Sequence, residues 1–208
     1  MPFGAFWRSL HFYSSQLFFL FSLAHFTVIL IEKWPPTYAL TRWLRLVASL
    51  PVLILLLFTG YVLRGDITGE MAGRIAENIA LSVPILGRWL DELLFSIADE
   101  QLKRVYANHL IGLGILWGIL SWDHVKKFKV NWRRNGGLLA GLLAFCFFLD
   151  APMDQEMLGD FHIPGPWFFI GLQELLRYIQ PFWAGVLFPT SFFVALMLLA
   201  SERTRVRK

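Results

Sequence analysis

The feature that most constrains this chain is a series of apolar stretches long enough to cross a lipid bilayer. An α-helix needs about 20 mostly apolar residues to span the hydrocarbon core, and inside the bilayer it satisfies its own backbone hydrogen bonds. Five stretches reach or approach this length, the fourth being the shortest: Leu10–Ile31, Leu46–Leu63, Val105–Trp122, Gly136–Leu149 and Pro181–Ala200. We therefore predict an all-α integral membrane bundle of about five transmembrane helices.

The composition agrees with a membrane protein. Hydrophobic residues make up 56% of the 208 positions, which is more than a soluble domain of this size carries. The net charge of +4 comes from residues at the ends of the apolar stretches, so topology accounts for it and we expect no nucleic-acid partner. Cys146 is the single cysteine, which excludes a disulfide, a cysteine-ligated iron–sulfur cluster and covalent haem attachment. We interpret it as a packing residue.

The charges of the connections alternate along the chain. Lysine and arginine predominate after the first stretch, after the third stretch and in the C-terminal tail, whereas acids outnumber bases in the other two connections. Cytoplasmic connections carry an excess of basic residues. The pattern predicts a protein of a bacterial or archaeal cytoplasmic membrane, embedded in lipid, with its N-terminus outside and its C-terminus in the cytoplasm.

Two of the apolar stretches carry a histidine at each end. His11 and His25 are 25 − 11 = 14 residues apart, and His109 and His124 are 124 − 109 = 15 residues apart. On a helix these spacings correspond to about 21 and 22 Å, with both rings of a pair on nearly the same face. The charge pattern runs the two helices antiparallel, so His11 meets His109 at the outer side and His25 meets His124 at the inner side. Because imidazoles on both faces of a porphyrin hold its iron, we predict two b-type haems.

A different interpretation of the histidines remains open. A lone histidine inside a membrane is more often a packing residue or a proton-relay group than a haem ligand. Four of the five histidines fall into two matched pairs, which favours haem. The alternative is a haem-free transporter or scaffold whose histidines relay protons.

The two acidic connections are predicted to hold short helices at the outer surface. Two amphipathic helices are expected over Ile75–Leu81 and Trp89–Ile97. In the second connection, prolines at a helix start precede an apolar segment that is too short to span. We expect Pro164–Arg177 to lie in the interface before the last stretch.

Several motifs resemble the cytochrome b family of quinol–cytochrome c reductases and its b6 relative. Thr59-Gly60-Tyr61-Val62-Leu63 is similar to the end of that family's third helix, and the spacings of 14 and 15 are similar to the b6 type. The resemblance implies that Gly60 adjoins a haem and that Arg8 and Arg104 hold the propionates of the outer haem. Ser14 stands where the family has a glycine that lets haem approach. The family's first helix and its C-terminal helices have no counterpart.

The C-terminal part resembles the quinol-site segment of the same family. We therefore expect residues 1–130 to form a diheme core and residues 131–208 to form a quinol-site-like part. The family's Pro-Glu-Trp-Tyr motif reads Gly165-Pro166-Trp167-Phe168 here, so its proton-accepting glutamate is missing.

Glu174 is our candidate for the missing proton acceptor. It follows Trp167 by seven residues, which on a continuous helix returns it to nearly the same face. Trp167 and Glu174 are the candidate quinol-site residues, and Asp160 and His162 are further titratable candidates in the same connection. An ordinary surface carboxylate is an equal alternative for Glu174.

These features predict a diheme b-type cytochrome that carries electrons between a quinol/quinone pool and partner redox subunits, as the membrane subunit of a quinol:acceptor oxidoreductase. Since the chain lacks iron–sulfur and c-type ligands, other subunits of a Rieske or cytochrome c type would do that chemistry, in a complex for which dimerisation stays open. The missing glutamate favours an alternative. In that alternative the chain is a membrane-anchoring electron conduit to a catalytic or multihaem subunit, without bifurcated quinol oxidation.

Overall fold

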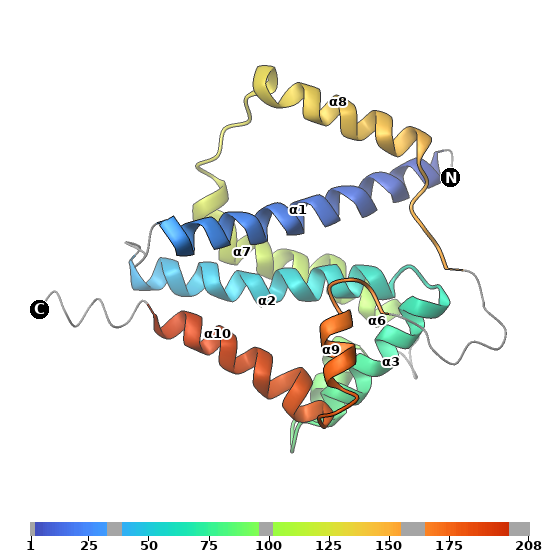
Figure 1. The fold of residues 1–208 in the computed structure, drawn as a ribbon, viewed down its shortest axis with the longest axis vertical. Coiled ribbons are helices and arrows are strands. Elements are labelled where there is room, and N and C mark those ends of the chain that lie inside the picture. The colour runs from blue at the N-terminus through green and yellow to red at the C-terminus, as the bar shows by residue number, and fades with distance from the viewer. Residues whose placement is uncertain (1–2, 33–38, 96–101, 155–164, 200–208) are drawn as a thin grey trace, which may run out of the picture. The chain divides into compact units, whose positions relative to one another are not determined.

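The computed structural model describes residues 3–32, 39–95, 102–154 and 165–199. In these residues every element of regular secondary structure is a helix, which confirms the predicted all-α class (Figure 1). Three helical spans of the described chain are long and apolar enough to cross a membrane: Gly4–Glu32, Leu40–Val62 and Leu102–Val125. They begin six, six and three residues before the predicted stretches, which start at Leu10, Leu46 and Val105.

The last of these spans is not a uniform α-helix. It runs without interruption through α6 (Leu102–Ala107), the π-helical turn η1 (Asn108–Leu113) and α7 (Gly114–Val125). The predicted fourth and fifth segments also form helices. They are α8 (Trp132–Phe148), with 17 residues, and the apolar span Phe182–Leu198, which comprises η2 (Phe182–Leu187) and α10 (Phe188–Leu198). Both are at the short end of what spans a bilayer, so five crossings stay a prediction.

The helices form two compact units, and the first comprises residues 1–37 and 121–153. Its main contact is between the N-terminal end of α1 (Gly4–Glu32) and the C-terminal end of α8, as Figure 1 shows. The buried Ser9 hydroxyl accepts a hydrogen bond of 2.8 Å from the backbone amide of Ala151. Nearby, the Tyr13 and Phe145 rings pack edge to face with centroids 4.9 Å apart. Ser9 thus fixes where the chain after α8 meets α1.

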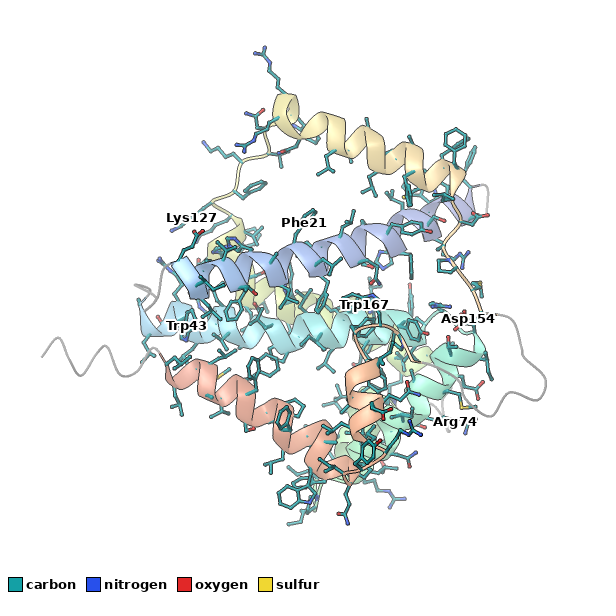
Figure 2. The ribbon with its side chains drawn as sticks, viewed as in Figure 1. Phe21, Trp43, Arg74, Lys127, Asp154 and Trp167 are labelled. Atoms are coloured by element: carbon teal, nitrogen blue, oxygen red, sulfur yellow. The ribbon has the colours of Figure 1, made fainter. Side chains whose placement is uncertain are left out.

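The second unit comprises residues 38–120 and 154–208 and contains the larger apolar core. It is built on α2 (Leu40–Val62), which contacts α3 (Ile67–Leu81), η1 and α10. Trp43 is buried, and its indole N–H donates to the carbonyl of Leu196 at 2.8 Å, which joins α2 to α10 (Figure 2). The buried members of the core come from α2, α3, α6 and the adjoining turns: Phe58, Val62, Ala72, Ala76, Ala80, Phe95, Val105 and Phe169.

The two predicted surface helices exist with different boundaries. The first is α3, which begins at Ile67 instead of Ile75, because the Asp66 carboxylate caps it by accepting a hydrogen bond of 3.0 Å from the Gly69 amide. The second is α4 (Gly87–Leu94). Between them the chain turns so tightly that a Cβ at Gly87 would lie 2.6 Å from the Leu81 carbonyl oxygen.

The predicted boundary at residue 130, between a diheme core and a quinol-site-like part, is not a boundary between these packing units. The units describe which helices touch, whereas the division concerns which segment holds haem and which binds quinol. It therefore stays a prediction.

Candidate cofactor site

The structure brings two of the predicted ligand histidines together within the first unit. His25 lies near the C-terminal end of α1, and His124 lies in the last turn of α7. Their ring centroids are 6.0 Å apart and the ring planes are inclined at 47°. These are the residues that the sequence pairs at the inner side.

This separation can be compared with what one iron would require. A metal-bound imidazole nitrogen lies about 2.0–2.1 Å from its metal, and the ring centre lies roughly 1 Å further out. Two imidazoles on opposite sides of one iron therefore place their centroids about 6 Å apart. The observed separation of 6.0 Å agrees with this distance.

His109 lies in the second unit, inside the π-helical turn η1. Its Nδ1 is 2.9 Å from the hydroxyl oxygen of Thr59 on α2. The ring also faces Gly60, where a Cβ would lie only 3.1 Å from His109 Cε1. The small residue that the family resemblance singled out thus makes room for the imidazole itself.

Two side chains hold the π-helical turn against the C-terminal end of α4. The Asn108 amide donates to the carbonyls of Leu93 and Leu94, and an Nη of Arg104 donates to the carbonyl of Glu92. These carbonyls belong to the last turn of α4, which lacks intrahelical partners for them. π-Helical turns are rare and concentrate at functional sites. The presence of one around His109 therefore supports a functional role for this predicted ligand.

The two histidines of the predicted outer pair belong to different units, His11 to the first and His109 to the second. His11 lies on α1, where its carbonyl accepts a hydrogen bond of 3.2 Å from the Ser14 hydroxyl. Ser14 therefore uses its hydroxyl within its own helix. The pairing of His11 with His109 stays a prediction.

Both predicted propionate-binding arginines make hydrogen bonds to backbone. Arg8 donates to the carbonyl of Ala151 at 2.6 Å, and Arg104 donates to Glu92 as described above. Propionate binding by Arg8 and Arg104 stays a prediction.

The geometry assumed for the quinol-site segment is wrong. The helix there, α9, covers only Ile170–Leu175, and Trp167 lies in the turn before it. The turn forms because the Pro166 carbonyl accepts from the amides of Phe169 and Ile170 at 2.7 and 3.1 Å. Glu174 consequently does not share a helix face with Trp167 by periodicity.

Glu174 lies on the exposed side of α9 and pairs with a nearby cation. Its side chain is 52% exposed, and its carboxylate is 3.1 Å from Arg177. Trp167 is also exposed, to 51%. The further candidates Asp160 and His162, and Pro164 at the predicted helix start, lie outside the described residues.

A polar cluster that the sequence analysis missed surrounds the start of α3. The buried Asp66 carboxylate pairs with Arg64, accepts from the backbone amide of Asp154 at 3.0 Å and shares Arg64 with the Asp154 carboxylate. Burial by itself raises the pKa of Asp66, but the amides of Asp154 and Gly69 and the Arg64 charge outweigh it and hold the pKa below its usual range. Asp66 could have been recognised in the sequence as the N-cap of α3, because aspartate is a preferred N-cap residue whose side chain accepts from an amide in the first turn, here that of Gly69.

Long apolar helices of the described residues define an all-α membrane protein, and the His25 and His124 rings lie near each other in it. The chain matches the family described as cytochrome b (N-terminal)/b6/petB over residues 16–136, more than half of its length. It belongs to this family, which confirms the resemblance found in its motifs. As a member of a family of b-type cytochromes it is an integral membrane protein for which haem b binding is implied.

Curated relatives agree with this assignment. The chain is 29% identical over 133 residues to cytochrome b6 of Synechococcus sp. (strain RCC307), and 30% identical over 133 residues to cytochrome b6 of Prochlorococcus marinus (strain NATL1A). Each match covers 62% of this chain and 61% of the relative, so the chain spans about three fifths of the relatives' length. No solved structure matches.

Proposed function

We propose that this chain is a diheme b-type cytochrome subunit of a membrane electron-transfer complex. The observation that carries the proposal is the 6.0 Å separation of the His25 and His124 rings. Each of these histidines lies on an apolar helix that carries a second histidine 14 or 15 residues away. Family membership and this doubled pattern together support two haem sites.

In this proposal His25 and His124 hold the inner haem iron, and His11 and His109 hold the outer one. Bound haem supplies reversible one-electron transfer, and two imidazoles per iron leave no open coordination position. The protein's contribution is to keep the four rings on two helices, with Gly60 leaving space beside His109. Arg8 and Arg104 are proposed to bind the outer propionates, because guanidinium groups bind carboxylates strongly.

The donor and acceptor are proposed from the family and the sequence. Electrons pass between a quinone pool in the lipid and partner redox subunits of an iron–sulfur or c-type cytochrome kind. The charge pattern supports an outer N-terminus and a cytoplasmic C-terminus. Glu174, with its half-exposed carboxylate on α9, is the proposed proton acceptor beside Trp167 if quinol is oxidised at the outer side.

One observation favours a second function. Pro166 occupies the place where the family's quinol-site glutamate is expected. Without that group the chain is suited to act as an electron conduit, which transfers electrons between an inner quinone site and a catalytic or multihaem subunit. The haem-free transporter has no support from the family assignment.

The test is a haem count on the purified chain with its partners retained. The wild-type protein should contain two b haems, and His124→Ala should remove one while the other keeps its spectrum and midpoint potential. The fifth histidine provides the matched control, since His162→Ala should leave both haems in place. Two haems with unchanged potentials in His124→Ala would show that the ligand assignment is wrong.

A further inference from the structure

We propose that the connection between α7 and α8 (Figure 1) binds the headgroups of anionic phospholipids. The inference goes beyond the proposed electron transfer and does not depend on haem; it rests on the membrane class of the protein. The connection and the first turn of α8 carry a basic patch of five exposed residues, which are Lys126, Lys127, Lys129, Arg133 and Arg134.

The basic patch has little negative charge in its own segment. Five of the nine residues from 126 to 134 are basic and none is acidic. Asp123, in the last turn of α7, pairs with Lys126 at 2.5 Å. Within the described residues the other four basic side chains form no ion pair. The patch therefore keeps four positive charges that an external anion can neutralise.

The start of α8 adds to this positive charge. The N-terminus of a helix carries a partial positive charge, so it favours acidic residues in its first turn. The first turn of α8 has no acid and holds Arg133 and Arg134 instead. The Asn131 side chain accepts from only one of the amides there, that of Arg134, at 3.1 Å. An anion beside the two arginines would relieve their repulsion by the helix dipole.

Exposed aromatic rings alternate with these charges along the chain. Trp122, Phe128 and Trp132 are 63%, 70% and 68% exposed. Tryptophan is enriched where the hydrocarbon of a bilayer meets the headgroups. An isolated phosphate ion would use the charges alone, whereas a phospholipid offers apolar chains to the rings and a phosphate to the cations. The combination therefore favours a lipid as the occupant.

The basic patch also lies at the depth of the headgroups. The apolar span Leu102–Val125 is long enough to cross a membrane and ends one residue before Lys126. Clusters of about four to eight basic residues directly beside such a span attract anionic lipids. The positive-inside rule accounts for the side of the membrane on which the charges lie. It does not require five of them to gather within one short connection beside exposed rings.

The test measures phospholipid binding to the purified, haem-loaded chain with its partners retained, by native mass spectrometry in detergent. The probes are anionic phosphatidylglycerol and zwitterionic phosphatidylcholine with the same acyl chains. We expect the wild type to prefer phosphatidylglycerol. Lys129→Gln combined with Arg133→Gln should weaken phosphatidylglycerol binding about 30-fold, because each basic residue near an anionic membrane surface contributes roughly a factor of five.

Two control variants separate the charge of the patch from other effects. Lys129→Arg combined with Arg133→Lys keeps both charges and should bind phosphatidylglycerol as the wild type does. Arg74→Gln combined with Arg88→Gln removes the same net charge from α3 and α4, where each arginine already pairs with a glutamate. This variant should also bind like the wild type. An unaltered haem spectrum shows that a variant is folded.

A second measurement uses the wild type alone. Raising the ammonium acetate concentration shortens the screening length, from about 10 Å at 0.1 M to about 3 Å at 1 M, so phosphatidylglycerol binding should weaken and phosphatidylcholine binding should not. Equal affinities for the two lipids, or unchanged phosphatidylglycerol binding in the folded Lys129→Gln, Arg133→Gln protein, would overturn the inference. Phosphatidylglycerol binding that appears only after the partner subunits are removed would also overturn it, because an acidic partner protein would then be the occupant.

Discussion

The α-carbon of Gly60 lies directly beside the imidazole of His109, so that a methyl group added there would be 3.1 Å from Cε1. That distance is shorter than an ordinary contact between carbon atoms. The neighbour must move by a few tenths of an ångström for any larger residue to fit. The imidazole of His109 is therefore a reason for glycine at this position.

We predict that Gly60→Ala reduces haem binding at His109. The methyl group displaces the ring from its hydrogen bond with Thr59, so the site loses its fixed geometry. The variant should keep the haem proposed to bind at His25 and His124 and show a lower content, or a shifted potential, of the other proposed haem. The control is Gly141→Ala on α8, where a Cβ meets nothing within 4 Å. Equal haem content in both variants would contradict the prediction.

Asp66 should make stability depend on pH in the acid range. Its pKa is lowered in the folded protein, so its contribution is fully present above the unfolded pKa of about 3.9 and is lost as the pH falls through the lower, folded value. Asp66→Asn should reduce the free energy of unfolding at pH 7 by about 2 kcal/mol. The asparagine NH2 group would replace an acceptor oxygen by a donor, opposite the donors of Arg64 and the Asp154 amide.

The measurement is thermal unfolding in detergent at several pH values. The difference between the wild type and Asp66→Asn should shrink below about pH 4. Glu70→Gln on the same helix is the control, since Glu70 forms an exposed pair with Arg74 and such pairs contribute little. A difference that is constant over the whole pH range would mean that the Asp66 charge is not the cause.

Trp43→Phe should destabilise the contact between α2 and α10. The indole N–H donates to the Leu196 carbonyl in a buried position, and phenylalanine leaves that carbonyl without this donor. The expected loss is about 1 kcal/mol, as for other hydrogen bonds between helices in membranes. Unfolding in detergent measures it, and Trp183→Phe, at a half-exposed position, should have no effect.

Glu174→Gln distinguishes the two proposed functions. If Glu174 accepts the quinol proton, the variant should slow quinol-driven haem reduction on the order of 100-fold, the usual contribution of a general base. Haem content and reduction by dithionite should not change, and Glu70→Gln should match the wild type in all three measurements. An unchanged rate in Glu174→Gln would favour the electron conduit.

Local sequence determined the features that repeat along single segments. Apolar length is enough to predict helices in a bilayer, because the cost of unpaired backbone groups there leaves few alternatives. The spacing of His25 from His11 and of His124 from His109 lies within single segments, so it could be read directly. The family motif at Thr59–Leu63 is also continuous in the chain, which is why the family could be identified.

Only the tertiary structure decided how the side chains at these positions are held. The π-helical turn around His109 depends on Asn108 meeting carbonyls of α4, and the ring depends on Thr59, fifty residues away. The shortness of α9 follows from the turn at Pro166, in which the Gly165 amide also donates to the Gln173 side chain at 2.7 Å. These are contacts between groups whose spacing follows no helical period. A pattern along the chain predicts which residues share a face, whereas the partner of each face is set by packing between segments.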